Sequence, residues 1–482
     1  MQSGGGIITN KNNQMKEYTL GMIGLGTMGR NLLLNMADHG FKVTGYDKDP
    51  KMLKKLEEDG KEHQLQGFGV LEDFIQSLEL PRRIVLLVPA GPIVDSVISE
   101  LKPLLEKGDM IIDSGNSHFT DTSRRAEALA ETGIHFFGMG ISGGEEGARF
   151  GPSMMPGGDK EAYSAMKEIL EAVSAKVNDE PCVTYIGPGA SGHFVKMVHN
   201  GIEYAMMQLL AEAYELLKNG LGFSNEKIQE TFASWNEGRM KSFLMEVTAE
   251  VFKFKDEKTG DLLIDLIKDE AKAKGTGKWT SQVSMDLQSP IPTINEAVTS
   301  RDLSKLKGLR VQLAEAFPSE TSPVDEPQLV EELGDALYFS MIVSYAQGLH
   351  LLTQASIGYE YNLKLDEIAK IWRGGCIIRA ELLQDIYTAY SSKPDLEHLF
   401  LDANIQEKLK ANLEGMRKIV GIGVKSGIAI SAFASALTYF DSLRTKRLPS
   451  NLTQAQRDFF GAHTFERVDE EGIFHANWNP IA

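Results

Sequence analysis

Short apolar runs alternate with segments of helical length over the first third of the chain. One run covers residues 18–23, a second run ends at Tyr46, and two further runs cover residues 83–88 and 110–113. Each run has the length of a strand, and each intervening segment is long enough for a helix. The pattern therefore predicts an α/β domain of βαβ units over residues 18–190.

The pattern changes near residue 191. Strand-like runs stop there, and long amphipathic or wholly apolar helical stretches follow, so we predict an all-α helical domain over residues 191–447. Residues 448–482 form a C-terminal tail that is rich in aromatic and polar residues and poor in regular periodicity. Such a tail needs a surface to hold it if it is to be ordered. Residues 1–17 lack the apolar core of a secretion signal, and we expect a disordered extension.

Length and composition narrow the possible classes of protein. A chain of 482 residues exceeds what one hydrophobic core usually organises, which favours at least two domains. The apolar stretch over residues 419–437 is interrupted by Lys425, so we interpret it as a buried helix and expect no membrane span. A net charge of −17 without Lys/Arg blocks argues against nucleic-acid binding, although a few converging cations can still hold a small anion. Two cysteines without metal-ligand spacing favour a reducing, cytoplasmic location.

A glycine-rich turn follows the first strand-like run and opens the first helical segment. Its residues are Gly24, Leu25, Gly26, Thr27, Met28 and Gly29. In a βαβ unit these glycines permit the tight turn, the approach of a pyrophosphate and the close packing of helix on strand. The motif alone also suits a plain turn, but its flanks and Asp47 at the end of the second strand favour a dinucleotide site. We therefore predict a Rossmann-type dinucleotide-binding domain.

The segment GHFVKMVHNGIEY carries the most informative pattern. On a helix, its polar residues fall on one face: Lys196, His199, Asn200, Glu203 and Tyr204. Such a face fits either a solvated helix surface or the wall of a site, and the Gly-rich residues before it favour the site. Lys196 and Glu203 are candidates for a base and an acid that act on different atoms of one substrate. Lys196 would need a lowered pKa, which burial provides.

Two Gly-rich loops are candidates for anion binding. One is Ser-Gly-Gly at residues 142–144, after a strand-like run, and the other is KGTGKW at residues 274–279. The second loop is similar to a nucleotide P-loop, but Lys272 stands at the first glycine position and Trp279 at the magnesium-binding Ser/Thr position. Either loop alone is more often a simple turn, although backbone N–H groups beside lysines also hold a phosphate or carboxylate.

With these segments in place, the chain resembles the decarboxylating 6-phosphogluconate dehydrogenases of the β-hydroxyacid dehydrogenase superfamily, from about residue 18 to residue 480. The resemblance rests on GLGTMGRNL, IIDSGNS, GISGGEEGARFGPSMMPGG, GHFVKMVHNGIEY, KGTGKWT, IWRGGCIIR and NLTQAQRDFFGAHTFE, in the family's order. It implies oxidation of 6-phosphogluconate at C3 by NAD or NADP, loss of carbon dioxide and formation of ribulose 5-phosphate in the pentose phosphate pathway. It implies no metal.

The resemblance also implies roles for single residues. Lys196 would be the base at the C3 hydroxyl and then an acid, and Glu203 would protonate C1 of the enediol. The substrate would contact Asn116, Ser142, Gly143, Gly144, His199, Asn200, Tyr204, Lys274, Arg301, Arg457 and His463. The cofactor would contact the glycine turn, Asp47, Lys48, Asp49, Val88, Pro89, Ala90 and Asn116. In this family the tail threads into the partner subunit, so Arg457 and His463 would complete the partner's phosphate site in an obligatory homodimer.

Three places depart from the family pattern. Residues 272–273 differ ahead of the KGTG lysine, Pro89 stands where NADP-using members commonly carry Lys, and Asp-Lys-Asp at residues 47–49 replaces Asn-Arg-Thr. A carboxylate at Asp47 accepts hydrogen bonds from a ribose 2′-hydroxyl and repels a 2′-phosphate. We therefore predict a preference for NAD, although NADP is the family default.

Two other classes of protein share part of this pattern. A dehydrogenase of the 3-hydroxyisobutyrate type would share the glycine turn, the Ser-Gly-Gly loop and Lys196, but it has no need of a phosphate site with Arg301 and the tail. A catalytically silent dinucleotide sensor would keep the turn but has no need of both Lys196 and Glu203 on one helix face.

Overall fold

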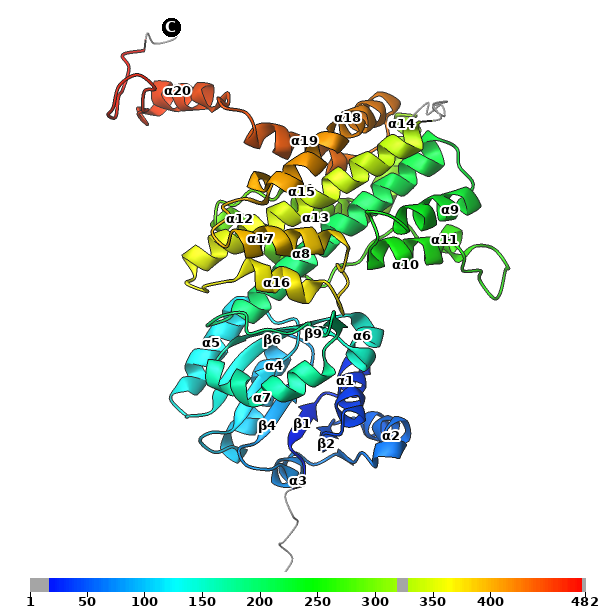
Figure 1. Cartoon of the computed structure of the whole chain (residues 1–482), viewed down its shortest axis with the longest axis vertical. Helices are drawn as coiled ribbons and strands as arrows, with labels where there is room; N and C mark the ends of the chain where they lie inside the picture. Colours follow the sequence, from blue (N-terminus) through cyan, green and yellow to red (C-terminus); the bar gives the residue numbers. More distant parts are fainter. Residues whose placement is uncertain (1–16, 319–327, 479–482) are drawn as a thin grey trace, which may run out of the picture.

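The computed structural model describes residues 17–318 and 328–478. The expected extension lies outside the described residues except for Glu17. The chain forms a sheet with flanking helices, a larger helical body, and a C-terminal helix that projects from that body (Figure 1). The fold is therefore the predicted α/β Rossmann-type domain followed by a largely helical domain and a tail.

The first part contains a seven-stranded sheet in the order β3-β2-β1-β4-β5-β6-β7. Its strands are β1 (Leu20–Ile23), β2 (Val43–Tyr46), β3 (Gly67–Phe68), β4 (Arg83–Leu86), β5 (Met110–Asp113), β6 (His135–Ser142) and β7 (Ser153–Gly158). Strand β7 pairs antiparallel to β6, and the other pairs are parallel. The chain reverses its direction of strand addition between β1 and β4, and this switch point is where such folds bind ligands.

Helices cover both faces of the sheet. They are α1 (Thr27–Asp38), α2 (Pro50–Asp59), α3 (Leu71–Ser77), α4 (Pro92–Leu101), α5 (Phe119–Ala130), α6 (Gly144–Phe150) and α7 (Lys160–Val173). One core joins the sheet to α1, α2 and α7, and the second joins it to α3, α4 and α5. Strands β1, β2 and β5 are buried at every position, as a parallel sheet covered on both faces requires. A short hairpin of β8 (Lys176–Val177) and β9 (Glu180–Pro181) leads to the helical part.

The helical part packs around one continuous core. Its helices are α8 (Ser191–Glu215), α9 (Asn225–Asn236), α10 (Phe243–Val251), α11 (Leu263–Leu266), α12 (Thr276–Asp286), α13 (Pro292–Ser304), α14 (Lys307–Ala316), α15 (Leu329–Gly358), α16 (Leu365–Trp372), α17 (Leu382–Ser392), α18 (Ala403–Ser426), α19 (Ser431–Leu443) and α20 (Ser450–Gly461). The long helix α15 is central and contacts α8, α18 and α19. Helix α8 packs on both the sheet and this core, so it belongs to neither part alone. The predicted domain boundary between residues 190 and 191 therefore stays a prediction.

One prediction about the C-terminal third is wrong. Residues 419–437 form the end of α18 and the start of α19, because Gly427 adopts a left-handed conformation (φ 68°) that ends α18. The tail contains α20 and a bridge between Phe465 and Phe474. Within the described ranges, no helix is both long and apolar enough to cross a bilayer. The cytoplasmic location stays a prediction.

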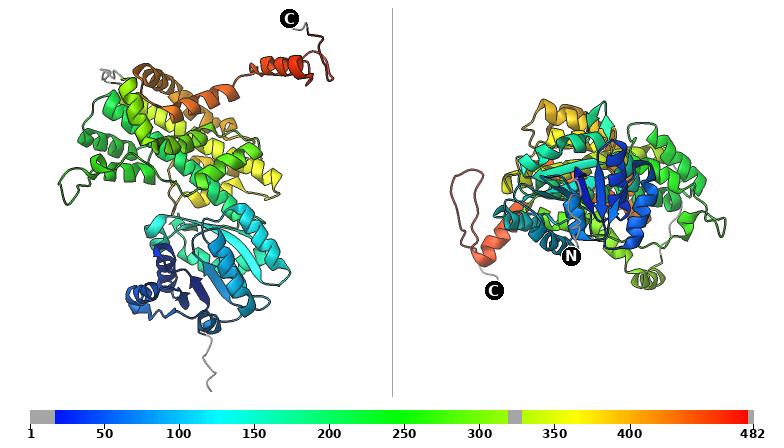
Figure 2. Two further views of the ribbon diagram at one scale, coloured as in Figure 1. Left: turned by 180° about the vertical axis from the view of Figure 1, so that it is seen from behind. Right: turned by 90° about the horizontal axis from the view of Figure 1, so that it is seen from below.

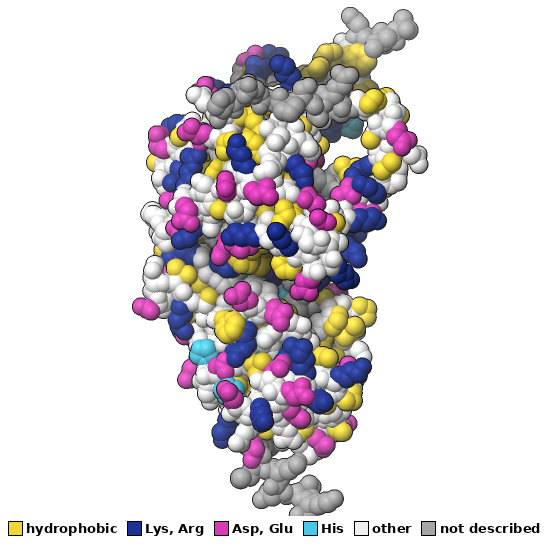
Figure 3. All heavy atoms as spheres, turned by 90° about the vertical axis from the view of Figure 1, so that its right-hand side faces the viewer, with side chains coloured by type: hydrophobic (Ala, Val, Ile, Leu, Met, Phe, Trp, Pro, Cys, Tyr) yellow, Lys and Arg dark blue, Asp and Glu magenta, His cyan; other side chains and the backbone are white. Residues whose placement is uncertain are grey.

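Helix α20 and the residues after it stand away from the helical body (Figure 2). The Asp458 carboxylate holds this segment together, because it accepts hydrogen bonds from the Thr464 and Ala476 N–H groups, His475 Nδ1 and Trp478 Nε1. Elsewhere, basic side chains are interspersed with acidic ones over the face in Figure 3.

Candidate active site

Close packing of α8 on the sheet places the polar face of this helix. A Cβ built on Gly140 of β6 would lie 2.3 Å from Lys196 Cβ, and one built on Gly192 would lie 2.3 Å from the Met155 carbonyl oxygen. Any side chain at these two positions would push the helix away. The glycines of GMGIS and GHFVK therefore bring Lys196 to the end of β6.

The predicted polar face forms a buried cluster. The Lys196 Nζ atom lies 3.5 Å from His199 Nδ1, which lies 3.1 Å from Asn200 Oδ1 and 3.9 Å from Glu203 Oε2. Ser142, the last residue of β6, places its Oγ 3.2 Å from His199 Nε2. Lys196 is 6% exposed and His199 is fully buried. The alternative of a solvated helix surface is therefore wrong.

Burial shifts the pKa values of the three ionisable groups in this cluster. It lowers the pKa of Lys196, against the opposing effect of the Glu203 carboxylate. Burial, followed by the Lys196 charge, holds the pKa of His199 well below its usual value. Burial also raises the pKa of Glu203, although Lys196 and Arg301 oppose this shift. The cluster therefore favours a neutral amine and a protonated carboxyl group, which are a base and an acid.

A cationic group adjoins the cluster at Tyr204. The Arg301 guanidinium lies 3.3 Å from the centroid of the Tyr204 ring. A Cβ on Gly277 would lie 2.6 Å from the same ring, so the N-terminal turn of α12 packs directly on Tyr204. Because the KGTG loop leads into α12, it brings N–H groups at a helix N-terminus close to Arg301. The arrangement suits a phosphate.

Two adjoining cavities lie at the carboxyl ends of the strands. The first, about 370 Å³, is lined by Ile23, Gly24, Gly26, Tyr46, Asp47, Lys48, Leu87, Val88, Pro89, Ile93, Ser96, Val97 and Glu100. The second, about 700 Å³, is lined by Gly26, Thr27, Met28, Gly29, Leu87, Val88, Pro89, Ala90, Gly91, Ser114, Gly115, Asn116, His118, Asp121, Ile141, Lys274 and Trp279. Both share Gly26 and residues 87–89. A ligand with two ends can therefore cross the glycine turn from one cavity to the other, as a dinucleotide requires.

The glycine turn and Asp47 are built as a dinucleotide site requires. A Cβ on Gly29 would lie 1.9 Å from the Gly24 carbonyl oxygen, so only glycine lets α1 start this close to β1. The Leu25 N–H donates to Asp47 Oδ2 at 2.8 Å, and the Asp49 N–H donates to Asp47 Oδ1 at 2.9 Å. These bonds fix the carboxylate at the wall of the first cavity. Asp49 instead caps α2 and lines neither cavity, so its contact with a cofactor stays a prediction.

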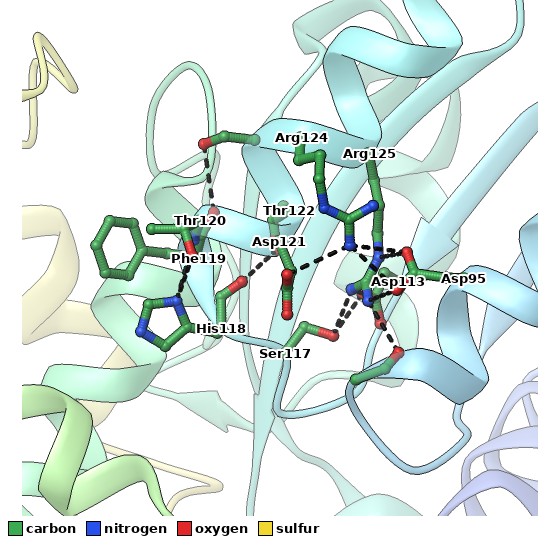
Figure 4. Close-up of polar contacts among 12 residues, drawn as sticks. Asp95, Asp113, Ser117, His118, Phe119, Thr120, Asp121, Thr122, Arg124 and Arg125 are labelled. Carbon is green, nitrogen blue, oxygen red and sulfur yellow. Dashed lines mark hydrogen bonds and ion pairs between the residues drawn. The ribbon is translucent and has the colours of Figure 1, made fainter.

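Behind the second cavity lies a buried ionic network that the sequence does not predict. Figure 4 shows Arg125 of α5 between Asp95, Asp113 and Ser117. Its guanidinium donates to Asp95 Oδ1 (2.8 Å), Asp113 Oδ2 (3.3 Å), Ser117 Oγ (3.2 Å) and the Gly91 carbonyl oxygen (3.0 Å). Arg125 thus joins the loop that contains Pro89 to the loop that contains Asn116. The only sequence signal was the position of both loops after parallel strands.

Two aromatic residues, His118 and Trp279, also line the second cavity, and the sequence does not predict this role for them. The His118 ring lies 4.9 Å from the Trp279 ring, in an edge-to-face contact between the sheet part and α12. This contact places the KGTGKW loop, and with it Lys274, on the wall that Asn116 also lines. The sequence marks the loop as an anion site but gives no sign of its partner on the sheet side.

The predicted tail residues are not brought to this cluster by their own chain. Arg457 lies on α20, where its Nη1 donates to Gln454 Oε1 at 3.1 Å, and His463 follows this helix. Helix α20 lies at the end of the molecule opposite the sheet (Figure 1). Of the other predicted substrate residues, Ser142 ends β6, Gly143 and Gly144 start α6, three lie on α8 and Arg301 lies on α13. Asn116 and Lys274 lie in loops that line the second cavity.

The fold and the cluster define a Rossmann-type dinucleotide-binding protein with a helical domain that supplies a buried lysine and a partly buried glutamate. Residues 19–187 match the model for the NAD binding domain of 6-phosphogluconate dehydrogenase, and residues 192–478 match that for its C-terminal domain. The chain belongs to the 6-phosphogluconate dehydrogenase family.

Relatives match along nearly their whole length. The NADP(+)-dependent, decarboxylating 6-phosphogluconate dehydrogenase of Bacillus subtilis (strain 168) is 50% identical over 96% of this chain and 100% of that protein. The decarboxylating enzyme of Escherichia coli (strain K12) is 46% identical over 96% and 100% of the two chains. A solved structure of Plasmodium falciparum 6-phosphogluconate dehydrogenase, studied as apo form and with NADP+ and 6-phosphogluconate, matches with a TM-score of 0.93 and 45% identity over 95% and 100%.

Proposed function

We propose that this protein catalyses the oxidative decarboxylation of 6-phosphogluconate to ribulose 5-phosphate and carbon dioxide, with reduction of NAD or NADP. The observation that carries the proposal is the pair of buried Lys196 and partly buried Glu203, whose pKa values are shifted in opposite directions. Their cluster includes Ser142, which directly follows Ile141 on the wall of the second cavity. Family membership supports the same reaction.

The residues of the cluster divide the reaction between them. The cofactor, held by the glycine turn and the walls of the two cavities, would supply the hydride acceptor for C3. Neutral Lys196 takes the proton of the C3 hydroxyl, and its ammonium then returns a proton to the C3 oxygen as the bond to the carboxylate carbon breaks. Glu203, whose protonated form burial favours, donates a proton to C1 of the enediol, while the enol hydroxyl gives its proton back to Lys196. The lowered pKa of His199 keeps a second cation away from Lys196 and leaves a neutral hydrogen-bonding group for the substrate.

Substrate binding is assigned to both ends of the cluster. The Ser-Gly-Gly loop with Asn116, His199 and Asn200 binds the carboxylate and hydroxyl groups, and Tyr204, Lys274 and Arg301 bind the phosphate. Arg457 and His463 complete the phosphate site of the partner subunit in a homodimer with exchanged tails. Exposed apolar side chains on the projecting tail, including Phe460 (73% exposed) and Ile473 (75% exposed), support a tail that is covered in the assembly.

The cofactor preference proposed is for NAD. Asp47 stands where a ribose 2′-hydroxyl is bound in such folds, and Pro89 supplies no cation to the cavity wall. The test is to measure kcat/KM for both cofactors with 6-phosphogluconate, following reduced nicotinamide and carbon dioxide together. Turnover without carbon dioxide release would contradict the proposed reaction. Asp47→Asn is expected to shift the ratio toward NADP, and a wild-type ratio strongly favouring NADP would contradict the preference.

A further inference from the structure

The first cavity, at the β1–β4 switch point, carries unbalanced charge. Among the residues that line it, the charged ones are Asp47, Lys48 and Glu100. Two carboxylates thus face a single ammonium group. Asp47 and Lys48 follow β2, whereas Glu100 reaches the same space from α4 across the cavity.

Glu100 is the residue that engages Lys48. Both Glu100 carboxylate oxygens lie 2.9 Å from Lys48 Nζ, and the Ser96 hydroxyl donates to Glu100 Oε1 at 3.3 Å. The hydrogen bond to Glu100 raises the pKa of Lys48 and so favours its charged form. Lys48 is the cation on this wall that is able to meet a phosphate on the adenosine ribose, and its ammonium is directed at Glu100.

We propose that Glu100 is a specificity-determining residue of the dinucleotide site, which disfavours a 2′-phosphate by holding the Lys48 ammonium. The inference rests on the proposed function only in taking an adenine dinucleotide as the ligand. A 2′-hydroxyl is neutral and donates to a carboxylate, so it tolerates this wall. A 2′-phosphate carries negative charge and must take Lys48 from Glu100 while approaching two carboxylates.

The pair is exposed, and this determines how the selectivity arises. The side chains of Lys48 and Glu100 are 66% and 39% exposed. Exposed ion pairs are weak and screened by salt. Selectivity therefore depends on which anion Lys48 neutralises, and we expect it to diminish at high ionic strength.

The test uses the full-length protein with Glu100→Gln, which keeps the shape of the side chain and removes its charge. We expect the ratio of NADP to NAD affinity, measured by calorimetry without the sugar substrate, to rise roughly tenfold. NAD affinity is expected to change by less than about twofold, because no contact with a neutral hydroxyl depends on the pair. The kcat/KM ratio should follow the affinity ratio. Glu131→Gln, exposed at the end of α5 and outside both cavities, is the matched control.

A second variant isolates the part played by Lys48. The effect of Glu100→Gln on NADP affinity is measured twice, once in the wild type and once in Lys48→Met. We expect the gain in the Lys48→Met background to be below about half of the gain in the wild type, because the ammonium that Glu100→Gln would free is absent. An unchanged ratio in Glu100→Gln, or a full gain without Lys48, would overturn the inference. Since affinity is measured without turnover, a chain that binds dinucleotides as expected but leaves 6-phosphogluconate unoxidised would refute the proposed function alone.

Discussion

At the residue scale, Lys196 and Glu203 show how one environment prepares two opposite groups. Removing water from an ammonium group lowers its pKa, whereas removing water from a carboxylate raises its pKa. Both shifts favour the neutral forms. Shifts in these directions lessen the cost of placing two charges two helical turns apart and favour a base and an acid on the same helix face.

The first prediction concerns Lys196→Met. We expect kcat to fall by about 10²- to 10⁴-fold, because the variant lacks the base, while the fold is retained. Steady-state kinetics with both cofactors measures the loss, and Lys393→Met, at an exposed position after α17, is the control. Near-normal kcat would remove Lys196 from the mechanism.

The same variant has a stability signature that depends on pH. The pKa of Lys196 is lowered in the folded state, so between that value and the ordinary value of 10.5 the unfolded state binds more protons. The contribution of Lys196 to the free energy of unfolding of the wild type therefore rises with pH across this window. We expect Lys196→Met to melt above the wild type at neutral pH, and the difference to shrink toward about pH 10. A difference that grows with pH would contradict the lowered pKa.

The second prediction concerns Glu203→Gln. The amide has the shape of the protonated carboxyl but cannot deliver its proton to carbon, so we expect the steps after hydride transfer to slow. Rapid mixing should then show a first turnover of reduced nicotinamide at near wild-type rate, followed by a slower steady state. Identical kinetics in every step after hydride transfer would show that another group protonates C1.

At the element scale, the sequence predicts the strands and helix faces that are set by a local repeat of apolar or polar residues. Strands β1, β2, β4 and β5 and the polar face of α8 follow from apolar runs and helical spacing, which local chemistry sets. The pairing of Arg125 with Asp113 and Asp95 does not follow, because it joins three elements that only the folded sheet brings together. The end of α18 at Gly427 was missed because an apolar stretch carries no mark of where a left-handed glycine divides it.

The third prediction separates two adjacent arginines of α5. Arg125 is buried and joins two cofactor-lining loops, whereas Arg124 shares Asp95 from an exposed position. Arg125→Met leaves buried Asp113 without its cation, so we expect a loss of about 2–4 kcal/mol in the free energy of unfolding. The loops also lose their common anchor, so KM for the dinucleotide should rise more than kcat falls.

Arg124→Met is the matched control for that experiment. It removes two exposed ion pairs, with Asp95 and Asp121, each of which contributes at most about 1 kcal/mol, and should leave KM for the dinucleotide near its wild-type value. Arg125→Lys, which restores the charge but not the planar set of donors, should recover stability better than KM. Equal effects of the Arg124 and Arg125 variants on KM would show that the network does not position the cofactor loops.

At the scale of the whole molecule, a single chain leaves its tail without a surface. Asp458 organises α20 and the following residues into a unit of their own, while Phe460, Val468 and Ile473 remain exposed. A preorganised segment with apolar side chains outward is suited to docking on another subunit, because little ordering entropy remains to be lost. Arg457 and His463 belong to this segment, and no contact of the described chain joins them to the Lys196 cluster.

The fourth prediction tests the exchange of tails with a mixed dimer. One subunit carries Arg457→Ala and the other carries Lys196→Met, and two different affinity tags allow the heterodimer to be isolated from both homodimers. If each tail serves its partner, the body with intact Lys196 receives the intact Arg457, and the other body receives neither. The heterodimer should then recover about half of the wild-type activity, although each homodimer is nearly inactive. If each tail serves its own chain, both bodies of the heterodimer lack one group, and activity should not exceed the average of the two homodimers.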